Sequence, residues 1–103
     1  MAKKIHLTLQ QSLEQKAGHY GELTKKALEK VEIRKGLDSR DEARAHDFLS
    51  MARNYFNDAR HFEEKGELLL ALAAFSYAHA WLDAGVRAKI LDGKNDDRLF
   101  TLP

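Results

Sequence analysis

Small and aromatic residues recur every seven positions in the second half of the chain, and this spacing constrains the fold more than any other feature. Between residues 40 and 65 the interval produces a line of alanines beside a line of aromatic residues: Ala45, Ala52, Ala59 and Phe48, Tyr55, Phe62. Between residues 67 and 91 it produces a line of small residues and two flanking lines: Ala71, Ala78, Gly85, then Leu68, Phe75, Leu82 and Ala74, Trp81, Ala88. Heptad spacing predicts helices packed side by side, and small residues in the seam let two backbones approach closely.

Glycines divide the chain into three helical segments. Gly36, Gly66 and Gly93 each follow a helical pattern, and a glycine in the left-handed conformation commonly ends a helix. The expected elements are helices over residues 8–35, 40–65 and 67–91 and a tail over residues 92–103. The tail ends in apolar residues that are expected to dock on the bundle or on a partner.

Capping residues support the predicted helix starts. Thr8 and Gln11 resemble a capping box at the start of the first helix, and Ser39 and Glu42 resemble one at the start of the second. The second and third helices are joined by little more than Gly66, which forces them to run antiparallel. The prediction is one all-α domain over residues 1–103: a three-helix antiparallel up-and-down bundle with a tightly packed hairpin of its second and third helices.

Composition excludes several classes of protein. Lys and Arg number 17 against 16 Asp and Glu, so the overall charge that would attract nucleic acid is absent, and on this ground we expect no nucleic-acid partner. With no cysteine there is no disulfide framework, which favours a cytoplasmic protein. The longest apolar stretch, Leu68–Leu82, is shorter than the roughly 20 residues that span a bilayer, so no membrane association is expected.

The third predicted helix is apolar on nearly every side. Beyond the heptad seam it carries a further apolar line: Leu70, Ala73, Tyr77, Ala80 and Ala84. A helix of this kind has to be covered on several faces. The first helix covers one of them, and we expect a second copy of the chain, in a homodimer, or a protein partner to cover the rest.

A polar stripe interrupts this apolar helix and is the first candidate for a site. His79, Asp83 and Arg87 are spaced four residues apart, with Tyr77 nearby. As a ligand site, Asp83 would orient His79 for proton transfer or hold Arg87 for an anion. As a structural feature, Asp83 would pair with Arg87, and His79 would be a hydrogen-bonded core histidine.

A metal or cofactor site is not predicted. The chain has five histidines: His6, His19, His46, His61 and His79. A di-iron bundle requires two Glu-x-x-His motifs, whereas this chain offers only the related Asp58-x-x-His61. Phosphate-binding loops and serine-nucleophile elbows are also missing from the sequence. We therefore expect no metal, no cofactor and no catalytic residues, which favours a protein that is not an enzyme.

The segment Asp47–Leu91 resembles an archaeal domain-of-unknown-function family, number 357. The similarity rests on Tyr55-Phe56-x-Asp58-Ala59, on Gly66 and on Tyr77-Ala78-x-x-Trp81-Leu82-Asp83-Ala84-Gly85-x-Arg87. The resemblance implies a short three-helix up-and-down bundle, an archaeal cytosolic origin and no assigned activity.

The same hairpin is more loosely similar to HEPN-type helical domains, some of which are ribonucleases with an arginine and a histidine in one motif. Arg40, Asp41 and His46 fit that motif. The function expected first is a non-enzymatic helical module for self-association or protein interaction. The alternative is a HEPN-like domain that binds or cleaves RNA with Arg40 and His46.

Overall fold

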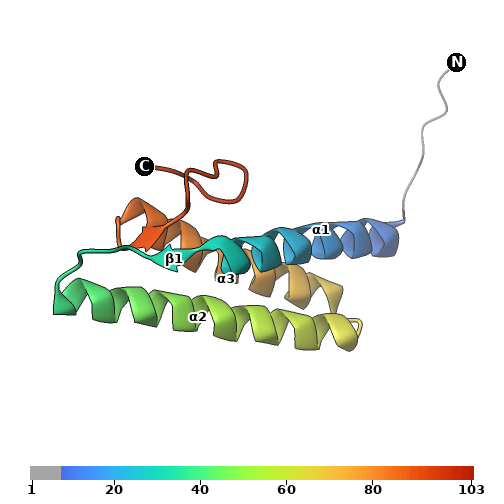
Figure 1. Ribbon diagram of the computed structural model, residues 1–103. Coiled ribbons are helices and arrows are strands. Elements are labelled where there is room, and N and C mark those ends of the chain that lie inside the picture. Colours follow the sequence, from blue (N-terminus) through green and yellow to red (C-terminus); the bar gives the residue numbers. More distant parts are fainter. Residues whose placement is uncertain (1–7) are drawn as a thin grey trace, which may run out of the picture.

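Three helices account for most of residues 8–103, the part of the chain that the computed structural model describes. The elements in order are α1 (Leu9–Lys30), β1 (Glu32–Ile33), α2 (Ser39–Glu64), α3 (Leu68–Arg87) and β2 (Leu91–Asp92). α1 and α3 run in one direction and α2 in the other (Figure 1). α3 packs extensively on both neighbours, whereas α1 and α2 touch each other far less. The chain is therefore an all-α up-and-down bundle with α3 as its central helix.

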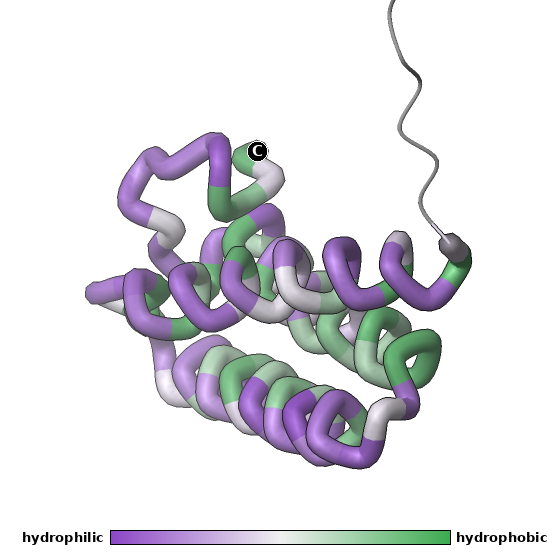
Figure 2. The backbone as a smooth tube through the Cα atoms, turned by 90° about the vertical axis from the view of Figure 1, so that its right-hand side faces the viewer, coloured by the Kyte–Doolittle hydropathy of each residue, from purple (hydrophilic) through white to green (hydrophobic). Residues whose placement is uncertain are grey.

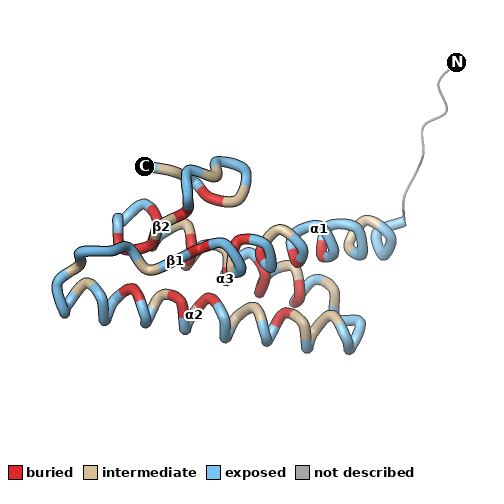
Figure 3. The backbone as a smooth tube through the Cα atoms, viewed as in Figure 1, coloured by how far each residue is buried: buried red, intermediate tan, exposed pale blue. Residues whose placement is uncertain are grey.

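The alanine seam joins α2 to α3 as predicted. All of its alanines have no exposed surface: Ala45, Ala52, Ala59, Ala71 and Ala78. Aromatic pairs flank the seam, because Phe48 meets Trp81 edge to face and Tyr55 lies against Tyr77. Figure 3 shows the buried positions of the helices turned toward one another. The predicted tight hairpin of the second and third helices is confirmed.

α1 begins as predicted but ends earlier. The Thr8 side chain accepts a hydrogen bond from the backbone of Gln11, and the Gln11 side chain accepts one from the backbone of Thr8, so the capping box is present. The helix ends at Lys30 rather than at residue 35, because Val31 takes an extended conformation and the chain enters β1. β1 pairs antiparallel with β2, with Glu32 opposite Asp92. This ribbon fastens the end of α1 to the chain that follows α3.

A glycine inside α1 allows this helix to sit close to α3. A β-carbon on Gly21 would lie 2.8 Å from the ring of Phe75, which is closer than real β-carbons approach. Gly18 has nothing within 4 Å of the same position and is exposed. Both glycines lower intrinsic helix propensity. Only at Gly21 does the packing of α1 on α3 require a residue without a β-carbon.

The boundaries of the other two helices also differ from the prediction. The N-cap of α2 is Asp38, whose carboxylate accepts from the backbone of Asp41, so the capping box predicted at Ser39 is wrong. A carboxylate at this position also interacts favourably with the positive end of the helix dipole. α3 ends at Arg87 rather than near residue 91, because Lys89 takes a left-handed conformation with φ 62°. Gly36 and Gly66 are left-handed as expected.

The C-terminal tail folds back onto the bundle, so the expectation that it docks is met within the chain itself. Phe100 is 3% exposed and belongs to the larger core cluster, together with Leu82, Val86 and Leu91. Figure 1 shows the tail lying over the end of α3 beside the ribbon. Part of the core is therefore supplied by a segment that has no helical pattern.

By length and composition alone, α3 is long and apolar enough to cross a membrane. Among the described residues it is the one helix that meets this criterion. The central helix of a soluble bundle has the same composition. Figure 2 shows strongly hydrophobic first turns of α3, beside the turn that connects α3 to α2.

Candidate functional site

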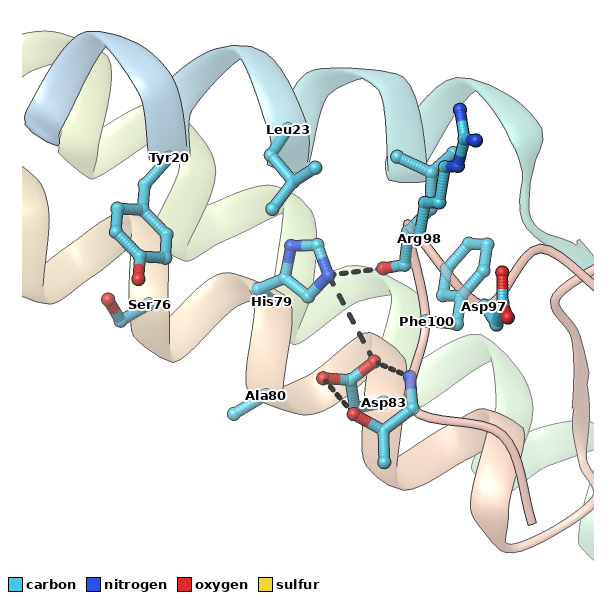
Figure 4. A pocket seen from close by; sticks show the side chains of 11 residues that line it. Tyr20, Leu23, Ser76, His79, Ala80, Asp83, Asp97, Arg98 and Phe100 are labelled. Carbon is cyan, nitrogen blue, oxygen red and sulfur yellow. Dashed lines mark hydrogen bonds and ion pairs between the residues drawn. The ribbon is translucent and has the colours of Figure 1, made fainter.

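His79 lies between α1 and the C-terminal tail, where both of its ring nitrogens are bonded. Nδ1 is 3.1 Å from the hydroxyl oxygen of Thr24, a residue with no exposed surface. Nε2 contacts the carbonyl oxygen of Leu99 (Figure 4). A carbonyl only accepts, so Nε2 carries the hydrogen, and in the neutral ring Nδ1 accepts from the Thr24 hydroxyl. His79 thus joins α1, α3 and the tail.

The next two residues of the polar stripe also bind the tail. Asp83 accepts a hydrogen bond of 2.9 Å from the backbone N–H of Thr101 and a longer one of 3.4 Å from its hydroxyl. Arg87 donates a hydrogen bond of 2.8 Å to the carbonyl of Leu102. The ion pair expected between Asp83 and Arg87 is wrong, because each side chain has a partner in the tail instead. The stripe as a whole holds the backbone of residues 99–102.

Tyr77 does not belong to this group. It lies two positions before His79, which places it about 200° away around the helix axis. The ring of Tyr77 lies against the ring of Tyr55 in α2, with the ring centroids 4.7 Å apart, and Tyr77 is 58% exposed. The structure therefore separates Tyr77 from His79, Asp83 and Arg87.

Sequence reasoning missed the tail residues that complete the group. Phe100 is buried against Gly93, and a β-carbon on Gly93 would lie 2.9 Å from the Phe100 ring. The ring centroids of Phe100 and His79 are 6.5 Å apart. The apolar residues Leu99, Phe100 and Leu102 were a visible signal in the sequence. Their partners were not predictable, because His79, Asp83 and Arg87 bind main-chain atoms, which every residue possesses.

A cavity of about 350 Å³ lies between α1, α3 and the tail. Its lining includes Tyr20, Leu23, Ser76, His79, Ala80, Asp83, Asp97 and Arg98 (Figure 4). The polar groups of α3 at its wall are already bonded within the chain, since Ser76 donates to the carbonyl of Leu72 and Asp83 accepts from Thr101. This arrangement suits the holding of a segment better than proton transfer to a substrate.

Charged pairs brace the turn that leads into the tail. Lys30 of α1 is 2.8 Å from the carboxylate of Asp96, and this hydrogen bond, with those from the backbone of Leu99 and Arg98, lowers the pKa of Asp96. The backbone N–H of Lys94 likewise lowers the pKa of Asp92. Lys94 itself is 2.6 Å from Glu32, and this contact raises the pKa of Lys94.

A second candidate surface is the uncovered side of α3, which we name the open face. Its residues are Leu70, Ala73, Tyr77, Ala80, Trp81 and Ala84. Leu70 is 50% exposed, and the neighbouring Leu69 is 66% exposed. Two hollows of about 320 and 330 Å³ lie along it, one shared with Tyr55 and Phe62 of α2. The apolar line noted in the sequence is therefore not covered by the described chain.

The alternative RNA site is not assembled into a pocket. Arg40 and His46 are both exposed near the start of α2. They are six residues apart, so they project about 120° from each other around the helix. RNA binding or cleavage through this pair stays a prediction from the sequence.

The histidines within the described part of the chain do not form a metal-binding group. Among residues 8–103, no group of three His, Cys, Asp or Glu side chains lies close enough to hold a metal ion. His6 lies outside the described residues.

Comparison with known proteins identifies a family and no function. A family model described as "Protein of unknown function (DUF357)" matches residues 19–91, which include most of α1 and all of α2 and α3. The match contains His79, Asp83 and Arg87 but ends before the tail that they bind. No curated protein and no solved structure matches the chain. The chain belongs to the DUF357 family of proteins of unknown function.

Proposed function

We propose that the chain is a non-enzymatic helical association module, which pairs with a second copy of itself or a protein partner through the open face of α3. The observation that carries the proposal is the exposure of a helix face without charge. From Leu68 to Ala84 the only Asp, Glu, Lys or Arg is Asp83, and it is turned away from the open face toward the tail. Contiguous exposed apolar surfaces are typical of interaction sites.

The size of the side chains on the open face favours a helix as the partner. Ala73, Ala80 and Ala84 are exposed, and small residues let a second helix approach closely. Tyr77 and Trp81 lie among them, and aromatic side chains are enriched in the centres of protein interfaces. A partly exposed aromatic side chain between alanines provides an anchor with room around it.

Sedimentation of the full chain tests the proposal. We expect a concentration-dependent dimer at micromolar concentrations that is lost on Ala73→Glu, because a buried, unpaired carboxylate in the interface is costly. Ala43→Glu is the matched control, since Ala43 is exposed on α2 away from this face. A wild-type chain that stays monomeric at the highest soluble concentration would contradict self-association. Equal behaviour of the two variants would exclude the open face as the interface.

A further inference from the structure

The tail is recognised through its backbone and one side chain. His79, Asp83 and Arg87, one helical turn apart, bond to the carbonyl of Leu99, the N–H of Thr101 and the carbonyl of Leu102. Only Phe100 is deeply buried in this segment, at 3% exposure. Main-chain hydrogen bonds combined with a pocket for a side chain are one recurring way in which proteins bind an extended peptide.

Hydrogen bonds within the tail itself also shape this segment. The Asp96 carboxylate accepts hydrogen bonds from the backbone of Arg98 and Leu99, and the Asp96 carbonyl accepts one from Phe100. These contacts are local, so they form equally in the tail of another chain. The recognised unit is therefore a turn opened by an aspartate and followed by Leu-Phe-Thr-Leu.

The connection between β2 and the tail favours exchange of this segment. Lys94 and Asn95 both have positive φ, at 56° and 57°. The left-handed conformation is unfavourable for lysine, whereas asparagine tolerates it, so Lys94 is the residue of this connection whose backbone gains most when the turn opens. The cavity beside Leu99 and Thr101 additionally leaves room for a side chain that the tail itself does not supply.

We propose that the groove between α1 and the polar side of α3 is a peptide-binding site. The chain's own tail occupies it, and it accepts the same segment, an aspartate turn followed by Leu-Phe-Thr-Leu, from the tail of a second copy of the chain. His79, Asp83 and Arg87 bind the main chain of the peptide, and the Phe100 pocket selects its aromatic residue. This inference does not rest on the open face of α3, which meets the cavity of the groove at Ala80 and otherwise lies on another side of the helix.

The test uses the full chain and a fluorescently labelled peptide of residues 94–103. Thr101→Pro in the chain removes the N–H that Asp83 accepts and leaves every groove residue in place. We expect this variant to bind the peptide at least tenfold more tightly than the wild type, whose own tail competes. The double variant Thr101→Pro with Asp83→Ala, and a peptide with alanine in place of Phe100, should each lose at least tenfold in affinity.

Circular dichroism establishes that each variant is folded, and Phe100→Ala in the chain is a second way to loosen the tail if Thr101→Pro unfolds. The proposal is overturned if both folded, tail-loosened chains bind the peptide no better than the double variant. Unlabelled Asp83→Ala chain, whose tail sequence is intact and whose own groove is weakened, tests a second copy as the source of the segment. We expect it to displace the peptide from the Thr101→Pro chain, and failure to displace the peptide would overturn exchange of tails between copies. Ala73→Glu, on the open face and outside the cavity beside the tail, should leave peptide affinity unchanged, which separates this result from the outcome for the open face.

Discussion

Gly85 of α3 lies directly against the side chain of Leu91 in β2, with no space for a β-carbon between them. In the heptad pattern Gly85 continues the line of Ala71 and Ala78, which face α2. Its closest neighbour is instead the strand that returns after the helix. The glycine therefore lets the ribbon of β1 and β2 pack against the end of α3.

The Gly85→Ala variant should destabilise the fold, because a methyl group would overlap Leu91. We expect a loss of about 1–3 kcal/mol in the free energy of unfolding, as for other overpacked sites. Gly18→Ala is the matched control, since Gly18 is exposed with nothing within 4 Å of a β-carbon. It should stabilise by up to about 1 kcal/mol through helix propensity. Urea unfolding measures both, and equal shifts in the two variants would contradict the contact.

Enlarging the alanine seam should also destabilise the protein. Ala52 and Ala78 have no exposed surface between α2 and α3, so leucine at either position would force the helices apart at a cost of about 1–3 kcal/mol. Ala43→Leu, at an exposed position of α2, should have little effect. Thermal melting followed by circular dichroism compares the three variants. A seam variant that melts no lower than the parent would show that the helices are not closely packed.

The buried hydroxyl of Thr24 should stabilise the fold through His79. Thr24→Val keeps the shape of the side chain but leaves Nδ1 of His79 without its partner, which costs about 1–3 kcal/mol for a buried polar group. Thr24→Ser keeps the hydroxyl and loses only a methyl group, so it should cost about 1 kcal/mol or less. Chemical denaturation at neutral pH distinguishes them. If serine costs more than valine, the methyl group rather than the hydrogen bond is the important part of Thr24.

Docking of the tail should depend on pH in the acid range. The pKa of Asp96 is lowered from 3.8, first by its hydrogen bond from Lys30. A carboxyl whose pKa is lower in the folded state stabilises that state above its unfolded pKa, and this stabilisation is lost as pH falls through the folded value. The tail should thus stay docked at neutral pH and loosen below about 3.8.

Hydrogen exchange of the Phe100 amide, which donates to the carbonyl of Asp96, reports tail docking directly. Protection of this amide in the wild type should fall as the pH enters the acid range. In the Asp96→Asn variant, which lacks the titrating carboxyl group, protection should change less over the same range. Lys30→Ala should reduce the difference between them. Identical acid profiles for the wild type and Asp96→Asn would show that this carboxylate does not hold the tail.

The helical parts of the fold were predictable because their information is local and periodic. Ala52 and Ala78 recur in heptads, and Gly66 permits only an antiparallel connection, so the hairpin follows from the sequence alone. The ribbon was not predictable, since strands of two residues have no pattern. Residues 31–35 were expected to continue the helix because nothing nearby signals that residue 33 will pair with residue 91.

The polar stripe was found by its spacing, but its partners were misjudged. Asp83 and Arg87 are four residues apart, which favours a local ion pair. In the structure, main-chain groups of the tail compete successfully for both side chains. Main-chain partners have no residue identity, so a sequence shows which side chains can bond but not to which distant carbonyl or N–H.

The pairing of Glu32 with Asp92 has a consequence for the order in which the chain folds. The α2–α3 hairpin needs only contacts across a short turn, whereas the ribbon closes a loop that contains that whole hairpin. Closing a long loop costs more chain entropy than closing a short one, and contacts distant in sequence form slowly. On a ribosome, α1 is made before α2 and α3, yet the strand at its end finds its partner only once the chain after α3 has emerged.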